Sequence, residues 1–282
     1  MTPATPASGR TARRTGLAAL FLALALVSAG LSWGWRDSPV TSRAQDYAQS
    51  VATGLAATYV TLRGLNAFLS TAQEVEVGGS LFVQGTVQPL KVLEPIDDTV
   101  ERIAGVVFAV MLATGVLAVA LGPVGGVGLG MVALACAVAG IQAATRRGGA
   151  VPLPARGLLT YGLFLSLALP LTFVGADLMA DAMTAGVWED HQRIIAEITG
   201  GVADLADAEA ATDPGFLESL TAPMTSIADY RDFAARIYDN ADQLLGSYVM
   251  ILAVFAFKIF VLPATLLGAM FLVARRAARS GV

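Results

Sequence analysis

Residues 103–121 read IAGVVFAVMLATGVLAVAL, nineteen residues without a charged side chain. About 20 apolar residues in a helix cross the hydrocarbon core of a bilayer, so this stretch predicts a membrane-spanning helix. Four more apolar blocks follow the same logic, at 16–31, 129–144, 157–180 and 247–274. The chain is 55% hydrophobic and only 14% charged, with a mean hydropathy of +0.66. We therefore predict an all-α fold, a polytopic helical membrane bundle with amphipathic helices outside the membrane.

Charged residues are sorted between these apolar blocks. Residues 181–245 contain thirteen acidic and three basic side chains. Three other stretches contain bases and no acid, at 10–14, 146–156 and 275–279. Because cytoplasmic loops are enriched in Lys and Arg, we expect these three stretches in the cytoplasm and the acidic segment on the opposite side.

The number of crossings has two alternatives. If all five blocks cross, the three basic stretches cannot share one side of the membrane. If 103–144 makes one net crossing, four crossings satisfy every basic stretch, and part of 103–144 is re-entrant, interfacial or a long kinked helix. The four-crossing alternative divides the chain into a basic cytoplasmic tail (1–15), a span or signal anchor (16–35), an extracytoplasmic helical segment (36–102), two apolar blocks (103–144), a cytoplasmic linker (145–156), a span (157–180), an acidic extracytoplasmic helical segment (181–245), a span (246–274) and a basic tail (275–282).

The first apolar block has two interpretations as well. Residues 1–14 are basic and rich in Thr, Ala and Pro, and we expect them to be disordered. Val27-Ser28-Ala29 resembles a signal-peptide cleavage site. Trp33 and Trp35 instead suit the far interface of a retained span, and we favour an uncleaved anchor.

Three stretches are predicted to form amphipathic helices outside the membrane, at 41–72, 186–210 and 223–245, because their apolar residues recur every three to four positions. Asp213-Pro214-Gly215 is the expected turn between the last two. Another helix is expected to begin at Glu94-Pro95, since proline suits the first helical turn. Residues 81–93 predict no regular element.

Lys258 is the single residue with the strongest functional signal. It lies near the middle of the apolar block 247–274, where an ionisable side chain costs at least about 2.5–3.5 kcal/mol on insertion scales. It should therefore face other helices or water. Asp177 is the available partner for an ion or proton relay, but it lies close to the end of its own block. The alternative is a lysine that extends along its helix to the interface.

Two further sets of residues are candidates. Carboxylates at i, i+3, i+4 and i+7 share one helix face and suit a divalent cation or a basic partner; they are Glu94, Asp97, Asp98 and Glu101. Equally, acids at the start of a helix stabilise that helix without any ligand. Gly122, Gly126 and Gly130 form a GxxxGxxxG series, which allows close helix packing if the stretch is helical and marks a turn around Pro123 if it is not.

Several functional classes are disfavoured. One cysteine, Cys136, excludes an intrachain disulfide, and one histidine, His191, excludes a multi-histidine metal site. We expect His191 to be solvated. The sequence contains no motif typical of hydrolases, phosphate loops or redox centres. The predicted protein is not an enzyme, and it has no cofactor, catalytic residue or metal site and no nucleic-acid partner.

Two stretches resemble an uncharacterised family of bacterial inner-membrane proteins. The first combines Leu65-Asn66-Ala67 with the run Leu93–Arg102, and the second is Val254–Pro263. Glutamine is more usual in that family where Lys258 stands. The resemblance implies a location in the bacterial inner membrane and no activity.

Two functions are compatible with these observations. The first is a scaffold or assembly protein in the inner membrane, multi-pass, whose helices pack together into a homo-oligomer in the lipid bilayer. The second is a small transporter or channel, with a path near Lys258 and Gly122–Gly130. In both, segments 36–102 and 181–245 are predicted to be extracytoplasmic.

Overall fold

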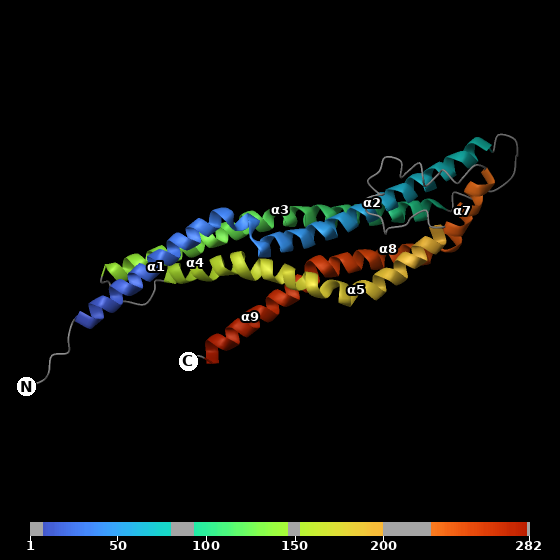
Figure 1. The fold of residues 1–282 in the computed structure, drawn as a ribbon. Helices are drawn as coiled ribbons and strands as arrows, with labels where there is room; N and C mark the ends of the chain where they lie inside the picture. The colour runs from blue at the N-terminus through green and yellow to red at the C-terminus, as the bar shows by residue number, and fades with distance from the viewer. Residues whose placement is uncertain (1–7, 80–92, 146–152, 200–226, 281–282) are drawn as a thin grey trace, which may run out of the picture. The chain divides into compact units, whose positions relative to one another are not determined.

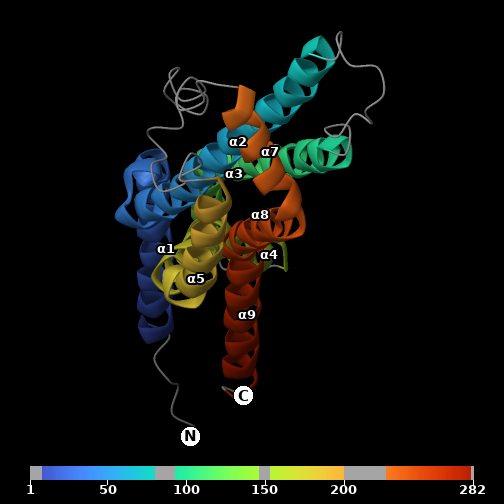
Figure 2. The same cartoon turned by 90° about the vertical axis from the view of Figure 1, so that its right-hand side faces the viewer.

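A computed structural model describes residues 8–79, 93–145, 153–199 and 227–280 (Figures 1 and 2). Of these residues 98% are helical, and they contain no strand. The helices are α1 (Ser8–Gly34), η1 (Trp35–Asp37), α2 (Pro39–Gly79), α3 (Glu94–Ala144), α4 (Leu153–Leu163), η4 (Phe164–Ala168), α5 (Leu169–Thr199), α7 (Ile227–Asp239), α8 (Ala241–Ala256), η6 (Phe257–Val261) and α9 (Leu262–Ser280). The all-α prediction is confirmed.

Four helical stretches are long and apolar enough to cross a membrane. They are Arg14–Thr71, Glu94–Ala144, Pro154–Thr199 and Ala241–Leu272. This finding agrees with a multi-pass membrane protein. It rests on helix length and composition, so insertion itself stays a prediction.

The glycine-rich stretch within 103–144 is helical. Helix α3 runs for 51 residues with Pro123 inside it, so of the two alternatives for Gly122–Gly130, a helix or a turn around Pro123, the structure has the helix. A proline removes one backbone N–H donor, and the helix continues on both sides of it. Of the alternatives for this segment, the structure has the long helix.

Other predicted boundaries also shift. Helix α1 begins at Ser8, so the expected disorder of 1–14 is wrong from that residue onward. Residues 186–199 continue the apolar block 157–180 in one helix, α5. The predicted helix 223–245 breaks at Asn240, whose side-chain amide donates to Arg236 O at 2.8 Å. The expected turn at Asp213 lies outside the described residues, as do residues 81–92 of the unassigned stretch 81–93.

Other boundaries match their predictions. Helix α2 covers the predicted 41–72, and the expected start at Glu94-Pro95 is the start of α3. The Ser38 hydroxyl caps α2, because its oxygen accepts from the Thr41 N–H at 3.3 Å. Pro39 occupies the first helical position. The buried positions on α2 follow the predicted stripe, and they include Val51, Leu55, Thr58, Leu62, Leu65 and Leu69.

Two turns of π-helix interrupt the later helices, and each ends before a Leu-Pro pair. In η4, Leu169 N–H bonds to Phe164 O, and in η6, Leu262 N–H bonds to Phe257 O. Pro170 and Pro263 follow directly. A proline ring collides with the carbonyl of the preceding turn and removes a donor, and a widened turn relieves both problems. The two prolines therefore explain the two π-helical turns.

The chain forms two compact units, to which the same four helical stretches contribute. Unit 1 comprises Met1–Tyr47, Leu117–Asp177 and Pro263–Val282, and unit 2 comprises Ala48–Val116 and Leu178–Leu262.

Unit 1 is packed through small residues on α3. A Cβ added to Gly128 would lie 2.8 Å from Gly162 O of α4, so the two backbones are in direct contact. On α1, Leu22 fills the space over Gly140, and Ala25 packs with Val132 and Cys136. Small side chains allow such close approach between helices.

Unit 2 is packed through larger side chains. Rings meet between α2 and α3 (Tyr59 and Phe108, 5.5 Å), between α2 and α7 (Phe68 and Phe233, 4.7 Å) and between α5 and α8 (Trp188 and Phe255, 5.3 Å). Phe233, Ala234 and Ile237 of α7 are buried. The amphipathic face of α7 therefore serves to attach it within this unit.

Candidate functional site

The most informative contacts of unit 2, two of them polar and one aromatic, join α5 to α8 and to η6, which continues α8. Three contacts occur in order, and we call them the α5–α8 seam: His191 with Ser247, Trp188 with Phe255, and Asp181 with Lys258. As residue numbers fall on α5 they rise along the other helix. The two helices are therefore antiparallel.

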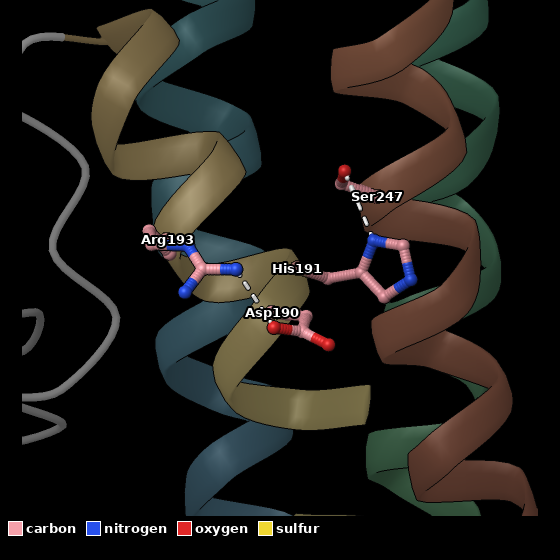
Figure 3. A network of polar contacts seen from close by, with 4 residues as sticks. All are labelled: Asp190, His191, Arg193 and Ser247. Atoms are coloured by element: carbon pink, nitrogen blue, oxygen red, sulfur yellow. Dashed lines mark hydrogen bonds and ion pairs between the residues drawn. The ribbon is translucent and has the colours of Figure 1, made fainter. Parts of the chain in front are cut away.

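One end of the seam is His191 (Figure 3). Its Nδ1 lies 3.2 Å from Ser247 Oγ, and Ser247 Oγ itself donates to Gln243 O at 2.8 Å. Because the only hydroxyl hydrogen is used on Gln243, Ser247 accepts and His191 Nδ1 donates. His191 is half-buried, so the expectation that it is simply solvated is wrong.

This pair is unsuited to nucleophilic catalysis. A serine nucleophile must give its proton to a base, whereas Ser247 is buried and its proton points to a helix carbonyl. The neighbouring Asp190 bonds to Arg193 at 2.8 Å and does not orient the imidazole. Both members of that ion pair are well exposed, so its contribution to stability is small.

The other end of the seam is Lys258, which lies in η6. Its Nζ donates to Asp181 Oδ1 at 2.8 Å. The side chain of Lys258 is 19% exposed and that of Asp181 is 87% exposed. The structure thus places Lys258 against a carboxylate of another helix, as its depth requires, but the partner is Asp181 and not Asp177.

The four carboxylates at the start of α3 do not converge. Glu94, Asp98 and Glu101 are exposed. Asp97 is partly buried, and its Oδ2 accepts from Ser70 Oγ of α2 at 3.3 Å, while its Oδ1 is buried without a partner in the part of the chain that the structure describes. The described residues contain no group of three or more His, Cys, Asp or Glu side chains that could hold a metal ion.

Asp97 precedes the apolar run that begins at Ile103. Burial raises the pKa of its carboxyl group above the ordinary value of 3.8. The hydrogen bond from Ser70 opposes this rise, and the negative charges of Asp98 and Glu101 add to it. Asp97 is therefore a partly desolvated carboxylate in the first turn of α3.

The three glycines of the GxxxGxxxG series differ from one another. Gly122 is buried. A Cβ on Gly126 would lie 3.1 Å from Ser32 O of α1, whereas one on Gly130 would meet nothing within 4 Å. The closest approaches involve their neighbours Gly125, which faces the Trp35 ring, and Gly128.

Sequence reasoning missed Asp181 and Ser247, although the signal was present. Asp181 precedes His191 by 10 positions on α5, and Lys258 follows Ser247 by 11 positions on the other helix. Antiparallel helices with a common polar boundary bring such positions to the same depth. Our reasoning instead measured depth from the end of the block 157–180.

Comparison with known proteins finds no family, no curated protein and no solved structure that matches this chain. The family resemblance drawn from Leu65–Ala67, Leu93–Arg102 and Val254–Pro263 therefore stays a prediction.

Proposed function

We propose that this chain is a multi-pass protein of the bacterial inner membrane that acts as a non-enzymatic scaffold and assembles into a homo-oligomer through its helices. One observation carries the proposal: the polar side chains of the α5–α8 seam bond to one another and so join two helices. Interhelical hydrogen bonds and ion pairs are the usual means of fixing helix packing in lipid.

Four crossings are the topology of this proposal. The count of four sufficiently long and apolar helical stretches supports it, as does the sorting of charges. Residues 36–102 and 181–245 then lie outside the cytoplasm. Single cysteines at Ala150 and Ala210, in a Cys136→Ala background, test this with a membrane-impermeant maleimide. Labelling of Ala150→Cys from the periplasm contradicts four crossings, and labelling of Ala210→Cys alone supports them.

Oligomerisation is tested by measuring the mass of the assembled protein. The purified chain, reconstituted into lipid nanodiscs, is expected to give the mass of two or more copies by native mass spectrometry. The oligomer is expected to persist when the protein-to-lipid ratio is lowered. Copies that associate specifically stay together in one nanodisc and do not spread over empty ones. A single copy per disc at all protein-to-lipid ratios rules out the scaffold.

A transporter is the second candidate, favoured by Lys258, which lies in a π-helical turn of a membrane-length helix and pairs with Asp181 of α5. Such turns and buried charges occur at functional sites. A transporter predicts ion or proton flux in liposomes that the Lys258→Leu substitution abolishes. The scaffold predicts no flux above that of empty liposomes in either protein.

A further inference from the structure

The first half of the apolar block 247–274 packs against α5. His191 of α5 bonds to Ser247 at 3.2 Å, and Trp188 of α5 packs on Phe255 with ring centroids 5.3 Å apart. In the proposed four-crossing topology, the part of α5 that carries Trp188 and His191 lies outside the membrane. Ser247 and Phe255 then lie outside it as well, although their own stretch is apolar enough to cross.

A second helix leads to the same result. Gly54 of α2 faces Phe255, because a Cβ added to the glycine would lie 2.9 Å from the phenylalanine ring. The proposed topology places the segment 36–102, and with it Gly54, outside the cytoplasm. Two helices that are distant in the sequence thus hold Phe255 outside the membrane.

The apolar character of residues 247–257 has a source other than lipid. The buried side chains of α8 recur every three or four residues, and they include Leu244, Tyr248, Ile251 and Phe255. A stripe with this spacing is the face that a helix buries against other helices. The hydropathy of this stretch therefore reflects the interior of unit 2.

Charge locates the membrane surface on these helices. Lys258 is the first charged residue after Asp242, and Arg275 is the next one. Asp181 directly follows the apolar block 157–180 and pairs with Lys258 at 2.8 Å. Charged side chains are strongly unfavourable in hydrocarbon, and the Asp181 side chain is 87% exposed. Both charges avoid this cost where the two helices leave the hydrocarbon.

We propose that the Asp181–Lys258 pair lies among the phospholipid headgroups of the outer leaflet, so that residues 247–257 are outside the membrane and the last crossing is 259–274. The inference rests on the proposed topology and moves the start of the last span from residue 246 to residue 259. Headgroup chemistry matches the pair, because phosphate is a partner for the lysine and the ammonium group of phosphatidylethanolamine is a partner for the aspartate.

The shortened crossing is still long enough to span. Residues 259–274 are sixteen uncharged residues, which extend about 24 Å along a helix. A lysine at the end of a short span reaches the interface with its long side chain, and a bilayer thins locally around such a span at modest cost. Lys258 is then an anchor at the membrane surface.

Labelling of single cysteines tests this boundary. In a Cys136→Ala background, Ala253→Cys and Ala264→Cys are both at exposed positions, five residues before and six residues after Lys258. A membrane-impermeant maleimide on the periplasmic side is expected to label Ala253→Cys about tenfold faster, because thiols react as thiolates and these form in water. Equal protection of the two positions overturns the boundary.

Tolerance of an added charge tests the boundary without a label. Ala253→Lys places a cation in water and is expected to leave the amount of protein in the membrane unchanged. Ala264→Lys is the matched change within the crossing, and it should lower that amount by about a hundredfold, which corresponds to the insertion cost of a lysine in hydrocarbon. Losses of equal size for the two variants overturn the proposal.

The labelling sites that test the topology separate the two possible failures. Periplasmic labelling of Ala210→Cys but not of Ala253→Cys overturns this boundary and leaves the four crossings standing. Periplasmic labelling of Ala150→Cys overturns the four crossings, and the boundary is overturned with them. Labelling of Ala210→Cys and Ala253→Cys, without labelling of Ala150→Cys or Ala264→Cys, is the result expected from both.

Discussion

Units 1 and 2 are packed by different means. In unit 1 the helix backbones themselves approach, as at Gly128 and Gly162, where each glycine faces the other's carbonyl oxygen. In unit 2 the helices are separated by rings and joined by polar side chains, as at Phe255 and Ser247. Unit 1 can therefore accommodate little added side-chain volume between its helices, because a helix backbone cannot move aside as a side chain can.

The largest effect is expected from Gly128→Ala in unit 1. The new Cβ would lie 2.8 Å from both Gly162 O and Ser166 N, so the two helices must separate. Overpacking of this kind costs about 3 kcal/mol, and thermal unfolding in detergent should occur at a clearly lower temperature. Gly130→Ala is the control, because nothing lies within 4 Å of its Cβ. Equal melting temperatures for the two variants would contradict close backbone packing.

A gain in stability is expected from Tyr248→Phe in unit 2. The Tyr248 side chain is fully buried, and its hydroxyl has no hydrogen-bond partner among the described residues. Removal of a buried unsatisfied group gains about 1 kcal/mol, which a higher melting temperature would show. Ser166→Ala in unit 1 is the contrasting change, because Ser166 Oγ donates to Gly162 O at 2.7 Å. Destabilisation by Tyr248→Phe would show that the hydroxyl does have a partner.

A smaller loss is expected from Gly54→Ala, the counterpart of Gly128→Ala in unit 2. Its Cβ would lie 2.9 Å from the outer edge of the Phe255 ring. That ring can tilt away, so the cost should stay below about 1 kcal/mol. Combining Gly54→Ala with Phe255→Leu should remove the cost, and a double-mutant cycle measures the coupling. A loss as large as that of Gly128→Ala would contradict the contrast between the units.

The smallest effect is expected from Asp97→Asn in unit 2, and it depends on pH. Because the pKa of Asp97 is raised in the folded chain, the folded state binds the proton more tightly than the unfolded state does. The stability that this contributes is present below pH 3.8 and is lost as the pH rises through the folded pKa. Asparagine does not titrate. The melting temperature of the variant relative to the unaltered protein should therefore rise between pH 4 and pH 7, and a constant difference would contradict it.

The helical fold and most boundaries of the apolar blocks could be predicted from the sequence. The spacing of apolar residues and the length of an apolar run depend only on residues that are near one another in the chain. The stripe through Leu55, Leu62 and Leu69 is an example. Breaks were harder to predict. Pro123 looked like an interruption and is not one, while Asn240 looked ordinary and ends α7. Whether a proline breaks a long helix depends on the contacts around it, which residue types do not reveal.

The candidate site was predicted in part. Lys258 stood out because a charge in an apolar run has a known cost. Its partner, Asp181, lies 77 positions earlier in the chain. Which residues of the two helices meet depends on the register between the helices, and packing sets that register. The bond from His191 to Ser247 has the same origin. The tertiary pairing of polar residues therefore required the structure.

The widened turns at Phe164–Ala168 and Phe257–Val261 set the phase of the helices that follow them. Each has the same spacing, a phenylalanine five residues before Leu-Pro. A residue added to a helix rotates everything after it by about 100°, so each turn determines which side chains beyond it face inward. Tightening either turn to an ordinary α-helix without deleting a residue would rotate the helix beyond it by about 100°, whereas deleting one residue from the turn would give an ordinary helix of unchanged phase. Both turns thus behave as single-residue insertions that are taken up in a wider turn, so that the helix beyond each of them keeps its partners.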